Sequence, residues 1–174
     1  MHRYTKTAML LHWLTALLII SAFFLGLTMT GIHGITPTKL KYYSWHKWLG
    51  VTVLALACIR VLWRSANRPH AHPAGMPRWQ AKAADAMHLL LYFLIFAVPV
   101  SGYLYTCAAG VPVVYLGLFQ LPSLIEPNPE LKPLLKEVHY WLTMGMAAAV
   151  VAHALAALKH HFVDRDDVLK RMLP

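Results

Sequence analysis

Four histidines lie at matching depths in the long apolar stretches of this chain: His12, His46, His139 and His153. In hydrocarbon an ionisable side chain costs roughly 2.5–3.5 kcal/mol even on a lenient insertion scale, so such residues usually face a protein interior and bind something. His139 and His153 are fourteen residues apart on one predicted helix. Fourteen steps of about 100° end about 40° short of four full turns and span about 21 Å. One helix face therefore places an imidazole near each side of a bilayer whose core is about 30 Å thick.

Depth in the membrane pairs these histidines. We expect His46 and His139 about one turn below the outer surface, and His12 and His153 near the inner surface. Two neutral imidazoles on facing helices can hold a haem iron from both sides. The pattern predicts two haems, one ligated by His46 with His139 and one by His12 with His153. Neither cysteine lies in a C-x-x-C-H motif, which excludes covalent c-type attachment. Ligation by two histidines leaves no open iron position, so we expect electron transfer rather than oxygen binding.

His88 competes with His12, because it also lies one turn inside the inner surface. Depth alone leaves it open as an axial ligand. Tyr92 follows four residues later and shares its helix face. We favour a haem-propionate or quinone-site role for His88 and Tyr92. Any one of the five histidines could instead be a core residue that hydrogen-bonds a neighbouring backbone group.

Arg60 and two glycines support the predicted sites. Arg60 follows His46 by fourteen residues, which carries it to the inner haem level on the same face, where it could pair with haem propionates. Snorkelling to the inner headgroups is the alternative. Gly50 and Gly145 follow histidines by four and six residues, and their missing side chains would let a porphyrin approach the backbone. Close helix packing would explain these glycines equally well.

The elements that must position these residues are membrane helices. The 174 residues are 58% hydrophobic and 13% charged, against about 25% charged in soluble domains. Four apolar stretches are long enough to span a bilayer. They cover approximately residues 7–30, 43–63, 83–105 and 134–161. We predict one domain over residues 1–174, an all-α transmembrane four-helix bundle enclosing two b-type haems. A shorter apolar stretch, 111–121, should lie at the interface or over the end of the bundle.

The basic residues predict the orientation. All the arginines fall at the N-terminus, in or beside the loop after the second helix, or in the C-terminal tail: Arg3, Arg60, Arg64, Arg68, Arg78, Arg165 and Arg171. The positive-inside rule then places both termini in the cytoplasm. Because topology accounts for most of the net charge of +9, no nucleic-acid partner is implied.

The predicted outer side carries lysines instead. They are Lys39, Lys41, Lys47, Lys132 and Lys136. Around the outer haem they could steer a small anionic donor. Solvated loop charge is the plain alternative, and Glu126, Glu130 and Glu137 partly cancel the field.

The motifs in order resemble those of the bacterial cytochrome b561 family. They are HW at residues 12–13, H-x3-G with an arginine fourteen residues after the histidine, HLLLYFLIFAVPVSGY, and H-x5-G-x7-H-x6-HHF. The resemblance covers essentially the whole chain. It implies a multi-pass protein of the bacterial inner membrane with two haems b, held at the positions of His12, His46, His139 and His153. It also implies electron exchange with ubiquinone, and one branch of the family oxidises superoxide at the periplasmic face.

We therefore expect an electron carrier between a periplasmic donor, superoxide, and membrane ubiquinone. One alternative is a cytochrome b anchor and electron-relay subunit, with a dehydrogenase or hydrogenase as redox partner protein. Another is a histidine-lined metal or proton transporter, which a visible haem spectrum would exclude.

Overall fold

Four long helices make up most of the chain in the computed structural model, which describes residues 4–67 and 76–173. They are α1 (Lys6–Gly31), α2 (Pro37–Ala66), α3 (Arg78–Ala108) and α4 (Leu131–Lys159). Each is long and apolar enough to cross a membrane. The predicted four-helix fold is confirmed, and the helices extend past most of the predicted limits. Arg3 and Arg68, used above for orientation, lie outside the described residues.

Polar side chains explain where three helices begin. Thr5 accepts a hydrogen bond from the backbone N–H of Ala8 at 3.2 Å, and Thr36 caps α2 in the same way, with Pro37 in its first turn. The Asn128 side chain accepts from the backbone N–H of Leu131 at 2.9 Å. Because Thr36 and Pro37 start the helix, α2 begins well before residue 43.

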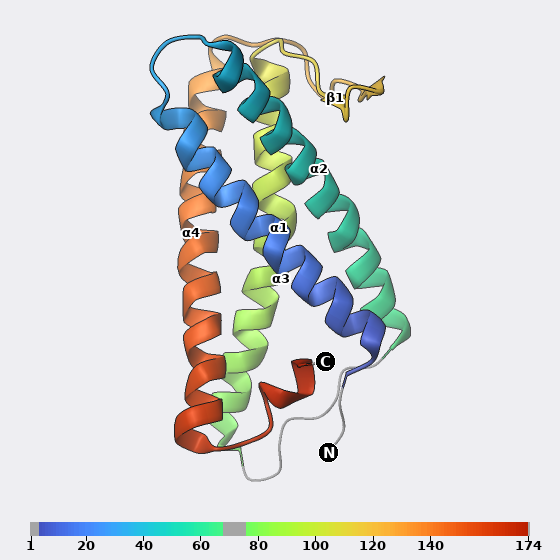
Figure 1. Cartoon of the computed structure of the whole chain (residues 1–174), viewed down its shortest axis with the longest axis vertical. Helices are drawn as coiled ribbons and strands as arrows, with labels where there is room; N and C mark the ends of the chain where they lie inside the picture. Colours follow the sequence, from blue (N-terminus) through green and yellow to red (C-terminus); the bar gives the residue numbers. More distant parts are fainter. Residues whose placement is uncertain (1–3, 68–75, 174) are drawn as a thin grey trace.

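The helices pack in sequence order. α1 lies against α2, α2 against α3, and α3 against α4. Figure 1 shows α1 crossing the bundle obliquely, with both ends of the chain at the same end of the molecule. The backbone N–H of Tyr4 donates to the carbonyl of Arg171 at 3.2 Å, which fixes the two terminal segments together. On the outside, Leu17, Phe24 and Leu155 are 61%, 61% and 60% exposed, as expected of side chains that face lipid.

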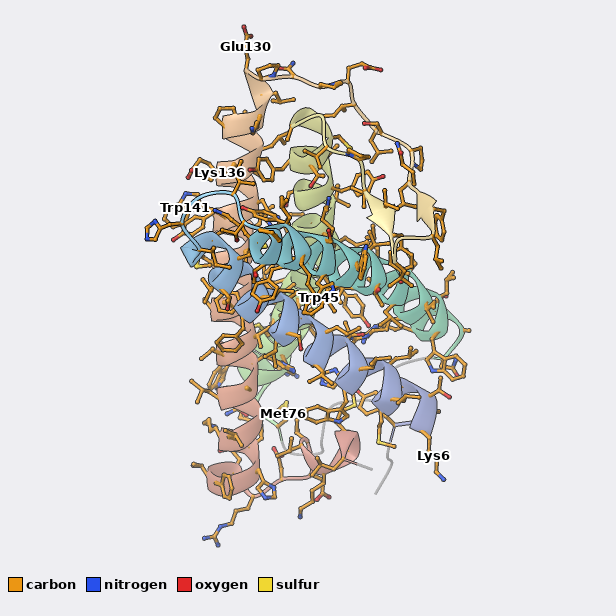
Figure 2. All side chains as sticks on the ribbon, turned by 45° about the horizontal axis from the view of Figure 1, so that its top comes forward. Lys6, Trp45, Met76, Glu130, Lys136 and Trp141 are labelled. Carbon is orange, nitrogen blue, oxygen red and sulfur yellow. The ribbon has the colours of Figure 1, made fainter. Side chains whose placement is uncertain are left out.

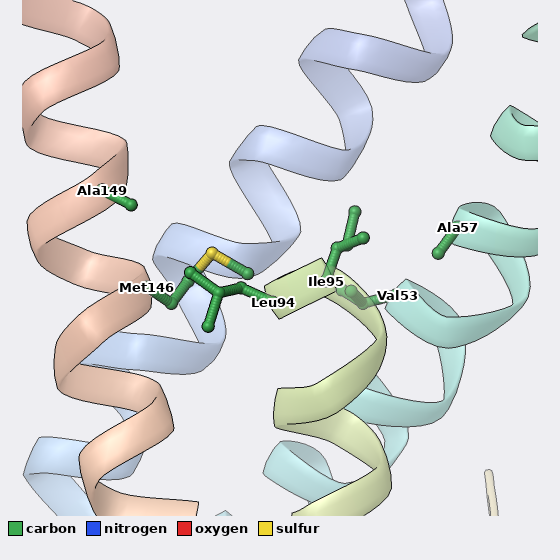
Figure 3. Close-up of a cluster of buried hydrophobic side chains, with 6 residues drawn as sticks. All are labelled: Val53, Ala57, Leu94, Ile95, Met146 and Ala149. Carbon is green, nitrogen blue, oxygen red and sulfur yellow. The ribbon is translucent and has the colours of Figure 1, made fainter. Parts of the chain in front are cut away.

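A buried apolar layer joins the helices near their middle (Figure 3). Its members come from α2, α3 and α4: Val53, Ala57, Leu94, Ile95, Met146 and Ala149. Leu18 and Ile19 of α1 pack against this layer. On α2 the layer residues lie between His46 and Arg60 in the sequence, and on α4 they lie between His139 and His153. The layer therefore separates two polar regions of the interior.

A short hairpin departs from the all-α prediction. In the 111–121 segment, β1 (Val114–Tyr115) pairs antiparallel with β2 (Phe119–Gln120). The turn between them uses left-handed backbone at Leu116 and Gly117, with φ of 52° and 75°. The indole N–H of Trp48 donates to the carbonyl of Val114 at 2.7 Å. The hairpin is thereby held against α2, at the end of the bundle opposite the chain termini (Figure 1).

Candidate functional site

His46 of α2 and His139 of α4 face each other at the end of the bundle opposite the termini. Their ring centres are 6.2 Å apart and the ring planes are nearly perpendicular, at 85°. The depth argument paired these two residues, and the structure brings them together. We call them the outer pair.

Backbone carbonyls determine which ring nitrogen carries the hydrogen in both outer histidines. Nδ1 of His46 lies 3.0 Å from the carbonyl oxygen of Ala22 in α1, and Nδ1 of His139 lies 3.1 Å from that of Val98 in α3. A carbonyl oxygen can only accept, so each Nδ1 carries the hydrogen. Each Nε2 then keeps its lone pair, which is the form of histidine that binds a metal.

Three histidines gather nearer the termini, and we call them the inner cluster. The ring centres of His12 and His153 are 6.3 Å apart, with an angle of 62° between their planes. The His88 ring of α3 lies 5.6 Å from His153, at 64°. The structure thus brings His12 and His153 together as predicted, but it also places His88 against the same partner.

Arg60 and Tyr92 adjoin the inner cluster. Arg60 Nη2 lies 3.5 Å from Nδ1 of His12, and the guanidinium stands over the Tyr92 ring at 5.6 Å. The guanidinium of Arg64, one turn later, also stands over the Tyr92 ring, at 5.4 Å from the ring centre. The fourteen-residue spacing between His46 and Arg60 therefore correctly predicted that Arg60 lies at the inner cluster. Arg60 is half-buried rather than fully extended into solvent.

The histidine spacing provides a test for iron porphyrin. Metal–imidazole bonds are about 2 Å long and a ring nitrogen lies about 1 Å from its ring centre, so two imidazoles on opposite sides of one iron have centres roughly 6 Å apart. The 6.2 Å of the outer pair fits this requirement, and so do the 6.3 Å between His12 and His153 and the 5.6 Å between His88 and His153. The residues present therefore fit two haems with histidine on both faces.

The glycines selected from the sequence make no close contacts. A Cβ built on Gly50 or Gly145 would meet no heavy atom of the described residues within 4 Å. Two other glycines, Gly26 and Gly102, lie directly against the outer imidazoles. Sequence reasoning missed both, although Gly102 belongs to the third-helix motif quoted above. Each glycine lies on the side of its helix that faces a histidine of another helix. Residue spacing along the sequence does not indicate which side of a helix faces which neighbour.

The predicted steering lysines lie at the outer end. Lys39 donates to the carbonyl of Ile32 at 2.7 Å, Lys47 donates to that of Pro112 at 3.2 Å, and Lys41 stands 4.6 Å from the Trp45 ring centre. Lys132 and Lys136 are exposed on the first turns of α4. Figure 2 shows Glu130 and Lys136 toward this end of the molecule and Lys6 at the other. Cation and carboxylate therefore share the outer surface.

Comparison with known proteins gives one consistent result. Residues 3–174 match the family model described as prokaryotic cytochrome b561. The chain is 36% identical to cytochrome b561 homolog 2 of Escherichia coli K12, over 98% of this chain and 91% of that one. It is 32% identical to cytochrome b561 homolog 1 of the same organism, over 100% and 98%. A Yersinia pestis protein named "Probable superoxide oxidase CybB" is 30% identical, over 94% and 92%.

Proposed function

The chain belongs to the prokaryotic cytochrome b561 family, a family of b-type haem proteins that transfer electrons in membranes, and on this premise we propose that it moves electrons between superoxide at the outer face and membrane ubiquinone. The observation that carries the proposal is the presence of two imidazole pairs, with centres 6.2 and 6.3 Å apart, toward opposite ends of a membrane bundle. Haem b supplies one-electron oxidation and reduction when bound.

We assign one haem to each pair of histidines. His46 and His139 would hold the outer one, and His12 and His153 the inner one. Arg60 lies beside His12 and would neutralise an inner propionate. Ring separation alone does not select His12, because His88 and His12 both lie roughly 6 Å from His153. We assign His12 as the ligand because its position matches a haem ligand in the family that the sequence resembles, and we assign His88 and Tyr92 to contact a propionate or the quinone. The role of Gly50 and Gly145 beside a porphyrin stays a prediction.

Superoxide as the donor is supported by two observations. A relative of 30% identity carries the name "Probable superoxide oxidase CybB". The outer end of this chain also carries Lys39, Lys41, Lys47, Lys132 and Lys136, a set of cations suited to attracting a small anion. The reaction balances when two superoxide anions each lose one electron and become dioxygen. Ubiquinone takes up both electrons with two protons and becomes the quinol.

We place the protein in the bacterial inner membrane with both termini in the cytoplasm. The contact between Tyr4 and Arg171 puts both terminal segments at one end of the bundle. Arg64, Arg78, Arg165 and Arg171 belong to the segments at that end, and lysines are the basic residues of the other. The positive-inside rule then assigns the arginine-bearing end to the cytoplasm. A reporter enzyme fused to the C-terminus should be active when it works in the cytoplasm and inactive when it requires the periplasm.

Stopped-flow mixing tests whether superoxide is the electron donor. Purified oxidised protein is mixed with superoxide or with ascorbate, and haem reduction is followed by its visible band, with and without a short-chain ubiquinone. We expect fast reduction by superoxide, slow reduction by ascorbate, and reoxidation once quinone is present. Equal or faster reduction by ascorbate would reject superoxide as the specific donor. A dehydrogenase that co-purifies with the chain, combined with no quinone-linked activity of the chain alone, would favour the relay-subunit alternative.

A further inference from the structure

The two outer histidines are held by the same local arrangement on two different helices. His46 approaches α1 where Gly26 follows the acceptor carbonyl of Ala22 by four residues. His139 approaches α3 where Gly102 follows the acceptor carbonyl of Val98, again by four residues. Residues four apart are neighbours on a helix surface, so each imidazole lies over a glycine and reaches the carbonyl one turn earlier. We call each arrangement a glycine–carbonyl clamp.

Glycine is required for this approach. A Cβ added to Gly102 would lie 2.8 Å from Cε1 and 3.1 Å from Nδ1 of His139. At Gly26 the added atom would lie 3.3 Å from Cε1 of His46. Carbon atoms at van der Waals contact are about 3.5–4.0 Å apart, so any side chain at Gly102 would push the ring off the carbonyl.

Ser101 strengthens the clamp on His139. Its hydroxyl donates to the Val98 carbonyl at 2.8 Å and its oxygen lies 3.1 Å from Nδ1 of His139. Since the carbonyl only accepts and the hydroxyl hydrogen is directed to it, the Nδ1–H is shared between the two oxygens. This leaves Nε2 of His139 as the free nitrogen and restricts rotation of the ring.

The inner cluster is built differently. Nδ1 of His12 faces Nη2 of Arg60, a donor, at 3.5 Å rather than a carbonyl acceptor. A hydrogen bond from Nδ1–H to a carbonyl raises the basicity of a ligating imidazole and fixes its orientation. His12 therefore differs from both outer imidazoles, whose Nδ1 atoms face carbonyl oxygens.

We propose that Gly26 and Gly102 are positioning residues of the outer haem site. They allow the Ala22 and Val98 carbonyls to hold His46 and His139 as Nδ1–H tautomers, with both Nε2 atoms directed to one iron. The inference rests on the proposed function, because it requires the outer pair to ligate haem. The clamps make both imidazoles stronger electron donors, which stabilises oxidised iron and lowers the midpoint potential of the outer haem relative to the same site without them.

Alanine substitution of each glycine tests the proposal in isolated membranes and in purified protein. The variants are G102A and G26A, and the matched control is G31A, because a Cβ on Gly31 would meet nothing within 4 Å. H139A identifies the signals of the outer haem as those it removes. The readouts are haem content, the g-values of the low-spin ferric signals by electron paramagnetic resonance, and the two midpoint potentials.

We expect G102A to weaken haem retention at the outer site by about tenfold or more, the range seen when partners of metal ligands are removed. G26A should keep both haems, because its 3.3 Å contact can be relieved by a small movement of the ring. The outer haem of G26A should show shifted g-values and a raised midpoint potential, while the inner haem and the G31A control match wild type.

Two results would overturn the inference. One is an outer haem in G102A and G26A with wild-type g-values and potential. The other is an equal change at both haems, which would indicate general packing instead of ligand positioning. If H139A retains both haems, the assignment of the outer pair itself fails, and the clamp proposal falls with it. Loss of one haem in H139A together with unchanged glycine variants rejects the clamps alone.

Discussion

Arg60 of α2 contacts His12 of α1 at the inner end of the bundle, with Nη2 lying 3.5 Å from Nδ1 of the imidazole. A guanidinium is permanently charged and can only donate, so it is a fixed cation beside the inner cluster. The outer pair instead faces the carbonyls of Ala22 and Val98. A fixed cation therefore lies beside one imidazole of the proposed inner site, whereas both imidazoles of the proposed outer site face carbonyl oxygens.

Replacing Arg60 with glutamine should lower the midpoint potential of the inner haem. A nearby cation disfavours the more positive oxidised state, so its removal favours that state. A weakening of the interaction by about 1.4 kcal/mol would shift a one-electron potential by about 59 mV. Redox titration of isolated membranes measures the midpoint potential of the inner haem in each variant. R64Q is the matched control, because Arg64 shares the contact with Tyr92 and is exposed. A larger shift in R64Q than in R60Q would contradict the assignment.

Alanine variants of the inner histidines should identify the axial ligands. Haem content of H153A and of H12A should fall to about one haem per chain, since we assign these two residues as the axial ligands of the inner haem. H88A should keep both haems, and its defect should appear in quinone reduction. The measurement is haem per polypeptide in purified protein. Retention of both haems by H12A, with loss of one by H88A, would exchange the two assignments.

Neutralising the outer lysines should slow the reaction with an anionic donor. Glutamine at Lys39, Lys41, Lys47, Lys132 and Lys136 removes the attraction, which can raise association rates by about ten- to a thousandfold. Stopped-flow rates at increasing salt should show a slower reaction and a flatter salt dependence. Lys82 and Lys159 belong to the segments at the other end, and glutamine at these two positions is the control that removes positive charge away from the outer pair. An unchanged rate with all five lysines replaced would remove steering from the mechanism.

Overfilling the middle of the bundle should destabilise it. Ala57 is 0% exposed within the apolar layer, so A57L forces its neighbours apart and should cost about 1–3 kcal/mol. The neighbouring residue Cys58 is exposed, and C58L adds bulk toward the lipid at little cost. Thermal unfolding in detergent, followed by circular dichroism, compares the two. If C58L loses as much thermal stability as A57L, helix propensity or lipid contact decides stability at this level of the bundle.

Local properties of the chain were enough to predict the four membrane helices and the level of each histidine along its helix. Apolar length decides whether a helix can span, and a rise of about 1.5 Å per residue decides how deep a residue lies. Both are local properties of the chain. For the same reason the fourteen-residue spacing on α4 led to one imidazole at each end, and the spacing on α2 led Arg60 to the inner cluster.

The tertiary structure alone decided which side chains meet at each depth. The meeting of His153 with both His12 and His88 depends on the rotation of each helix about its axis, and so do the clamps formed by Gly26 and Gly102. The hairpin at 114–120 likewise depends on a hydrogen bond from Trp48, which lies more than sixty residues earlier in the chain. Helix rotation is fixed by packing between distant segments, and that packing leaves no period or spacing in the sequence that could be read without the fold.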